Sequence, residues 1–260
     1  MVRFNSIKSI EISTEFLLPV VPLTVVASSG GIIWSHLPDF LQSSTLVLTF
    51  ILWANAIMIS LMITTVYMWK LFIYKIPHIG IVFSSFIPIG FSGQGAYAIQ
   101  LFGTNYYQYQ TKISQSQESF IAAVAIKHIT IFIGLMLQTL GYFLTFLAIV
   151  SVLSYLPNIR FNKNWWAMTF PMGTMSLAST ETFKMTGWYT FKVLGAIYGV
   201  FLIVITIVCL IGSLIWETPR SSSYEPKLKK DLENGIISSD QSNDTNDVDF
   251  MVSNRTYVNM

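Results

Sequence analysis

Long apolar segments separated by short polar ones make up most of the first 216 residues. Six of these segments have close to the ~20 residues that cross the hydrocarbon core of a bilayer. They cover residues 16–34, 46–69, 81–102, 120–155, 165–180 and 193–216. The fourth is long for one helix and short for two helices with a turn, and we interpret it as one tilted helix. The pattern therefore predicts an all-α membrane protein with about six transmembrane helices.

The two ends of the chain differ from this predicted transmembrane domain of residues 16–216. Residues 1–15 form a polar N-terminal segment. Residues 217–260 are rich in Ser, Asn, Asp and Lys and poor in aromatic residues, which is typical of a disordered tail. This tail contains two glycosylation acceptor sequences, at Asn243 and Asn254. We expect both ends to be cytoplasmic, so that these acceptors never meet the glycosylation machinery.

The apolar segments alternate in kind. The first, third and fifth contain proline followed by Gly and Ser, whereas the others are richer in Leu, Ile, Val and Phe and have no proline in their core. The prolines expected to kink the helices are Pro19, Pro22, Pro88 and Pro171. Proline frees a backbone carbonyl, and small residues let the backbone approach a neighbour or a solute. Tight packing would explain them in a single helix, but the alternation favours three hairpins, each with an inner helix lining a pathway.

Basic residues gather on one side of this topology. If the N-terminus is cytoplasmic, the inner segments carry Arg3, Lys8, Lys70, Lys75, Arg160, Lys163, Arg220, Lys227, Lys229 and Lys230. The outer segments then carry Lys112, Lys184 and Lys192, with Lys127 near them. Such an excess of Lys and Arg marks the cytoplasmic side of a membrane protein. Both termini are therefore predicted to be cytoplasmic.

The composition limits the chemistry that this chain can perform. Of its 260 residues, 53% are apolar and 11% are charged, against roughly 25% charged in an average soluble domain. No predicted span carries a charge at its centre, so a pathway would use backbone dipoles and hydroxyls, which suits weak, fast handling of a small anion. The net charge of +2 gives no reason to expect nucleic acid. The single cysteine and the three widely spaced histidines predict no metal site, cofactor or enzymatic centre.

Three sequence blocks resemble the fungal sulfite efflux pumps. The run Leu17-Leu-Pro-Val-Val-Pro-Leu-Thr-Val-Val-Ala-Ser-Ser-Gly-Gly31 resembles the fifth helix of that family. The run from Phe86 to Ile99, with the pattern Pro-x-Gly-x-x-Gly-Gln-Gly, resembles the seventh helix. The run from Asn164 to Gly173, with the specific block Trp-Trp-x-x-Thr-Phe-Pro, resembles the ninth. The wider superfamily includes the tellurite-resistance and C4-dicarboxylate transporters and the slow anion channels of plant guard cells.

The resemblance implies a ten-helix anion-channel fold with five hairpins around a central pore, the odd helices inside and the even ones outside. It covers residues from about 12 to 218 and only the last three hairpins. We therefore expect the chain to be a fragment, a truncated product or a partial gene model. The implied function is export of sulfite or bisulfite across the plasma membrane, and the relatives suggest a homotrimer in which each chain holds its own pore.

The resemblance also implies roles for individual residues. A phenylalanine of the ninth helix plugs the pore in the relatives, and the matching position here is Phe170. The candidate pathway-lining residues are Ser28, Ser29, Gly93, Gln94, Thr169 and Ser176. Gln94 is the strongest polar candidate, because its amide could donate to an oxyanion or, alternatively, hydrogen-bond to a neighbouring helix. For each of these residues taken singly, helix packing is the alternative role.

Two other functions fit the same features. The solute could be malate or another C4-dicarboxylate, although a basic residue for the second carboxylate would be expected in the pathway and none is visible in these segments. The chain could also be an inactive or accessory membrane protein, because three hairpins of five cannot close a pore within one chain.

Overall fold

The structure is a computed structural model that describes residues 14–74, 79–113, 116–155 and 161–217. The predicted cytoplasmic segments, residues 1–15 and 217–260, lie almost entirely outside these ranges. The chain divides into two compact units, residues 1–210 and 211–260. Of the second unit, only the last turns of the final helix are described. The arrangement set out below is that of the first unit.

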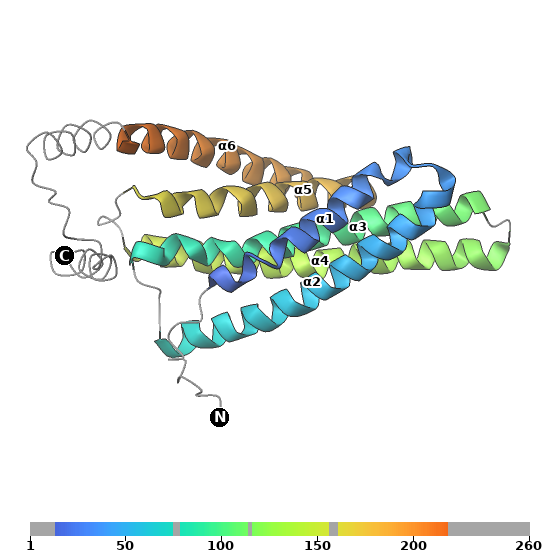
Figure 1. Ribbon diagram of the computed structural model, residues 1–260, viewed down its shortest axis with the longest axis horizontal. Helices are drawn as coiled ribbons and strands as arrows, with labels where there is room; N and C mark the ends of the chain where they lie inside the picture. The colour runs from blue at the N-terminus through green and yellow to red at the C-terminus, as the bar shows by residue number, and fades with distance from the viewer. Residues whose placement is uncertain (1–13, 75–78, 114–115, 156–160, 218–260) are drawn as a thin grey trace, which may run out of the picture. The chain divides into compact units, whose positions relative to one another are not determined.

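Six α-helices carry the fold, and the described residues contain no strand. The helices are α1 (Val21–Ile33), α2 (Asp39–Tyr74), α3 (Ile87–Ile113), α4 (Gln117–Leu153), α5 (Thr169–Thr186) and α6 (Tyr189–Glu217) (Figure 1). The predicted all-α fold is confirmed. The long fourth segment, residues 120–155, falls within the single continuous helix α4 and the turn that follows it.

Helices α1, α3 and α5 begin in the same way. Each follows a 3₁₀ segment: Thr14–Leu17, Ile79–Phe86 and Lys163–Met168. Pro22, Pro88 and Pro171 lie in the first α-helical turn, and Pro19 lies in the turn before α1. Proline is tolerated in a first turn because its missing N–H would have no intrahelical partner there. These prolines thus lie at or just before the start of each helix, and the kinks stay a prediction.

Helices α2, α4 and α6 are the apolar ones. The segments Asp39–Ile73, Gln117–Leu153 and Tyr189–Ile215 are long and apolar enough to cross a membrane, with mean hydropathies of 2.3, 2.2 and 2.8 over an 18-residue stretch of each. Their large apolar side chains are exposed, including Met62, Phe132 and Val200. An exposed apolar surface of this extent is stable when lipid covers it.

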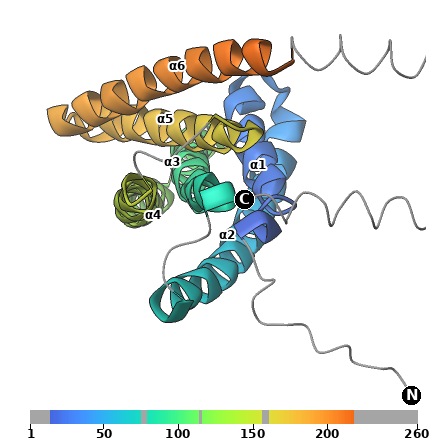
Figure 2. The same ribbon diagram turned by 90° about the vertical axis from the view of Figure 1, so that its left-hand side faces the viewer.

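Helix α3 is the centre of the first unit. It packs against α1, α2, α4 and α5, and the end view in Figure 2 shows it between α1, α4 and α5. Every residue from Pro88 to Ala96 is buried or nearly so. Its glycines allow this close packing: a Cβ at Gly93 would lie 2.8 Å from the backbone nitrogen of Met175, and a Cβ at Gly103 would overlap Thr130. The small residues of α3 therefore bring neighbouring helices into backbone contact.

Candidate functional site

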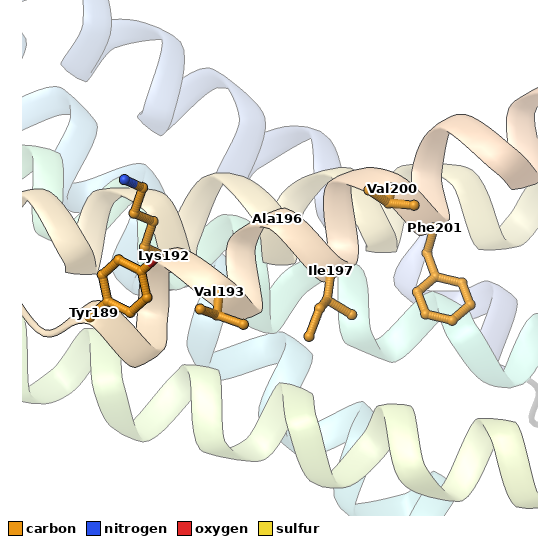
Figure 3. A pocket seen from close by; sticks show the side chains of 7 residues that line it. All are labelled: Tyr189, Lys192, Val193, Ala196, Ile197, Val200 and Phe201. Carbon is orange, nitrogen blue, oxygen red and sulfur yellow. The ribbon is translucent and has the colours of Figure 1, made fainter.

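One groove lies along α6, and its lining comes from that helix alone. Val193, Ala196, Ile197, Val200 and Phe201 line it, with Tyr189 and Lys192 at one end. Figure 3 shows the ammonium of Lys192 directed away from the side chains of Val193, Ile197 and Phe201. The groove thus offers an apolar surface without a polar group directed into it, as expected of a helix face that meets lipid.

A second cavity, of about 420 Å³, lies where the three inner helices begin. The start of each of α1, α3 and α5, or the segment just before it, contributes to the lining. The lining residues are Leu18, Val21, Pro22, Ser84, Ile87, Lys163, Asn164, Trp166, Ala167, Phe170 and Pro171. Three segments far apart in sequence thus meet around one space, and this cavity is the candidate site.

Phe170 is the predicted gate, and it lines this cavity. Its side chain is 41% exposed. Its ring also covers the α3 backbone, because a Cβ at Gly90 would lie 2.8 Å from Phe170 Cε1. Only a glycine at position 90 lets the ring approach so closely. The ring is thus in contact with α3 on one side and with the cavity on the other.

Gln94 and Ser28, both predicted to line the pathway, are joined in the structure. The Gln94 amide nitrogen donates to Ser28 Oγ at 2.5 Å, and Ser28 Oγ donates to the Val25 carbonyl at 2.9 Å. Both side chains are buried between α1 and α3. The amide group therefore hydrogen-bonds to a neighbouring helix, which is the second of the two roles that the sequence left open.

The other predicted pathway residues lie in different places. Gly93 packs on the backbone of α5, as described above. Ser176 donates to the carbonyl of Gly195 at 2.8 Å, so it faces α6. Thr169, next to Phe170, donates to the carbonyl of Trp166 at 2.8 Å, and Ser29 is exposed on α1. Of this predicted set, only Phe170 lines the cavity, and the pathway role of the other residues stays a prediction.

A charged pair in α5 was not part of the predicted site. Glu181 and Lys184 form an ion pair at 2.9 Å, with side-chain exposures of 10% and 63%. Both follow the predicted span of residues 165–180, but α5 continues to Thr186. The hydrogen bond from Lys184 to Glu181 raises the pKa of the lysine above its ordinary value, so the amine stays protonated. The sequence could have indicated this pair, because an acidic and a basic residue stand three positions apart in a helix.

A buried polar network joins α3, α4 and α5 and was also missed. The amide nitrogens of Gln100 and Gln138 both donate to Thr182 Oγ1, at 2.7 and 2.5 Å. The Tyr142 hydroxyl donates to Gln138 Oε1 at 3.3 Å and lies 3.0 Å from Ser179 Oγ. A glutamine inside an apolar run is itself a sign of such a network, because a buried amide needs partners. Among the described residues, no group of three or more His, Cys, Asp and Glu could hold a metal ion.

These features, with three long apolar helices whose exposed side chains suit lipid and with buried polar contacts between α3, α4 and α5, describe a multi-pass membrane protein. The chain belongs to the voltage-dependent anion channel family, whose model matches residues 2–214. It is similar to the sulfite efflux pump SSU1 of Candida albicans, with 36% identity over 86% of this chain and 48% of that protein. It is also similar to the sulfite efflux pump SSU1 of Saccharomyces cerevisiae, with 34% identity over 76% of this chain and 50% of that protein.

A more distant relative is the sulfite efflux pump SSU1 of Arthroderma otae, with 26% identity over 77% of this chain and 53% of that protein. The resemblance read from the three sequence blocks is thus confirmed. The chain spans about half the length of the curated relatives that it matches. No solved structure matches the chain at a significant level.

Proposed function

We propose that this protein exports sulfite or bisulfite across the plasma membrane. The observation that carries the proposal is the 36% identity to a sulfite efflux pump over 86% of the chain. The absence of a charged residue at the centre of any predicted span supports a solute that is bound weakly and moves fast. Sulfite fits this description, since it is a small oxyanion that hydroxyls and backbone N–H groups can bind.

The cavity at the heads of the inner helices supports a gated pathway. Three proline-started helices converge there, and Phe170 lies between the cavity and α3. Lys163 lines the same cavity and would attract an anion toward it. In this proposal the solute enters by the cavity and passes Phe170 to continue along the inner helices.

The proposal includes a topology and an assembly. We propose six spans, residues 16–34, 46–69, 81–102, 120–155, 165–180 and 193–216, with both termini in the cytoplasm. The lower hydropathy of α3 and α5 is consistent with spanning, because protein rather than lipid surrounds much of their surface. A homotrimer follows only from the family resemblance, in which each full-length chain holds its own pore.

Sulfite flux through the purified chain tests the function. The chain is reconstituted in liposomes loaded with sulfite, and release is followed with a sulfite-reactive dye outside. We expect release above that of empty liposomes, reduced by excess external bisulfite and unaffected by equal malate. Inhibition by malate alone would replace sulfite with a dicarboxylate as the solute. A correctly folded chain that releases neither anion would contradict the proposed transport.

A further inference from the structure

Helix α5 has one exposed stripe. Phe170, Leu177 and Lys184 are spaced seven residues apart, so they lie on the same face of the helix. All three side chains are exposed, at 41%, 48% and 63%. The other faces of α5 are occupied, since Gly93 of α3 packs on its backbone and Ser176 bonds to α6. The stripe therefore begins at the cavity with the proposed gate and ends with a cation.

The cation is held in place by a carboxylate that is itself nearly buried. Glu181 Oε2 accepts a hydrogen bond from Lys184 Nζ at 2.9 Å. A buried carboxylate without a partner is energetically costly, so the ion pair holds the Lys184 ammonium in position more firmly than an exposed pair would. An ordinary exposed i,i+3 pair would have both partners in solvent.

We propose that Lys184, positioned by Glu181, is a second contact for the transported oxyanion, about 21 Å along α5 from Phe170. A lysine ammonium has three N–H donors. One of them binds Glu181, which leaves two for an oxyanion passing along the exposed stripe. Because the pair is neutral overall, it offers donors to sulfite without the strong attraction of a bare cation. This inference rests on the proposed sulfite transport and names a residue that determines the affinity for the solute.

The two members of the pair give opposite predictions. Lys184→Gln removes the charge and replaces the ammonium by a shorter, neutral amide, and we expect the half-saturating sulfite concentration to rise about threefold to tenfold, since each factor of ten corresponds to only about 1.4 kcal/mol. Glu181→Gln leaves the lysine charge uncompensated, and we expect tighter half-saturation by a similar factor with a slower maximal rate. A merely structural salt bridge would lower the melting temperature, more in Lys184→Gln because that change leaves the nearly buried carboxylate unpaired, and would leave half-saturation unchanged.

Two further variants serve as controls. Lys184→Arg keeps the charge and should stay within about twofold of the parent. Lys192→Gln removes another lysine of the predicted outer side, one whose ammonium lies over the rings of Phe183 and Tyr189. It should also stay within about twofold. All five chains are compared in the same sulfite-loaded liposomes, and their thermal unfolding is measured in detergent.

The outcomes separate this inference from the proposed function. If the parent transports sulfite and Lys184→Gln has the same half-saturating concentration, the inference is overturned and the proposed function stands. The same holds if Lys192→Gln raises the half-saturating concentration as much as Lys184→Gln does. If Lys184→Gln does not fold, Glu181→Gln decides: tighter half-saturation supports the inference, and unchanged or weaker half-saturation overturns it. A parent that shows no flux but whose melting temperature rises with sulfite, through Lys184, supports the site and contradicts transport. A parent with neither response overturns both.

Discussion

Phe170 combines exposure with a close contact to the α3 backbone. Its ring packs over Gly90 and borders the cavity, so its removal would open space there without removing a buried core residue. We expect Phe170→Ala to increase sulfite release severalfold with little change in melting temperature. Phe132→Ala is the control, because Phe132 is 62% exposed on the outer helix α4. Equal release from both variants and the parent would mean that Phe170 does not obstruct the pathway.

Gly93 is a packing residue by its geometry. A methyl group there would lie 2.8 Å from backbone atoms of α5, which cannot move as a side-chain end can. We expect Gly93→Ala to destabilise the chain by about 1–3 kcal/mol, as overpacking does. Gly173→Ala provides the comparison, since the nearest atom to its Cβ would be 3.5 Å away. The measurement is thermal unfolding in detergent. A Gly93→Ala variant with the melting temperature of the parent would show that the α3–α5 contact is looser than described.

At the scale of the helices, Thr182 holds three elements together. Thr182 lies on α5, and its hydroxyl accepts hydrogen bonds from Gln100 of α3 and Gln138 of α4. Thr182→Val keeps the shape, leaves the buried Gln100 amide without its acceptor and leaves the Gln138 amide with only the Ala178 carbonyl. We expect a loss of about 1–3 kcal/mol, the cost of an unsatisfied buried donor.

The control for Thr182→Val is Thr65→Val. Thr65 is exposed on α2 and its hydroxyl bonds only to the carbonyl of Leu61 in its own helix. Its substitution should change the melting temperature within error. If both variants melt alike, the network would contribute nothing beyond what the same change costs in an isolated helix.

Most of the helical organisation could be predicted because lipid imposes it. A run of apolar residues long enough to span is a property of the chain itself, and this is why α2, α4 and α6 follow from hydropathy. The end of α5 shows where that reasoning fails. The predicted span ends before Glu181, because this residue is charged, but the helix continues to Thr186. It ends at Gly187, whose φ of 74° is the left-handed conformation of a C-terminal glycine. The residue that marks the end of this helix in the sequence is therefore Gly187 and not Glu181.

The candidate site was harder to predict than the helices. Sequence motifs marked Gln94 and Ser28 as polar residues of inner helices, but no one-dimensional pattern states that they bond to each other. Gly93 and Ser176 were marked in the same way, and each turns to a helix neighbour. Phe170 was predicted to be a gate because its block, Trp-Trp-x-x-Thr-Phe-Pro, is specific, and the structure puts it at the cavity. Which partner a small or polar residue meets depends on the rotation of both helices, and periodicity alone does not fix it.

At the scale of the first unit, the division between inner and outer helices has a physical cause. Lipid replaces water around α2, α4 and α6, so their exposed surface is apolar. Helices α1, α3 and α5 can carry proline, glycine and amide groups because protein satisfies them. Substitutions to polar residues should therefore be tolerated least on the outer helices and substitutions to large residues least on α3.

The membrane orientation is the last prediction, and glycosylation tests it. The sequence between α3 and α4 contains Ser114-Gln-Ser116, so Ser114→Asn completes an Asn-x-Ser acceptor in a predicted outer loop. Expressed in a eukaryotic cell, this variant should gain mass that an endoglycosidase removes, because acceptors are modified only on the lumenal side. The parent should gain none, although its tail carries acceptors at Asn243 and Asn254. Modification of the parent would place the tail outside and reverse the topology, which would make Lys184 a cytoplasmic residue and turn the proposed exit of the pathway into its entrance.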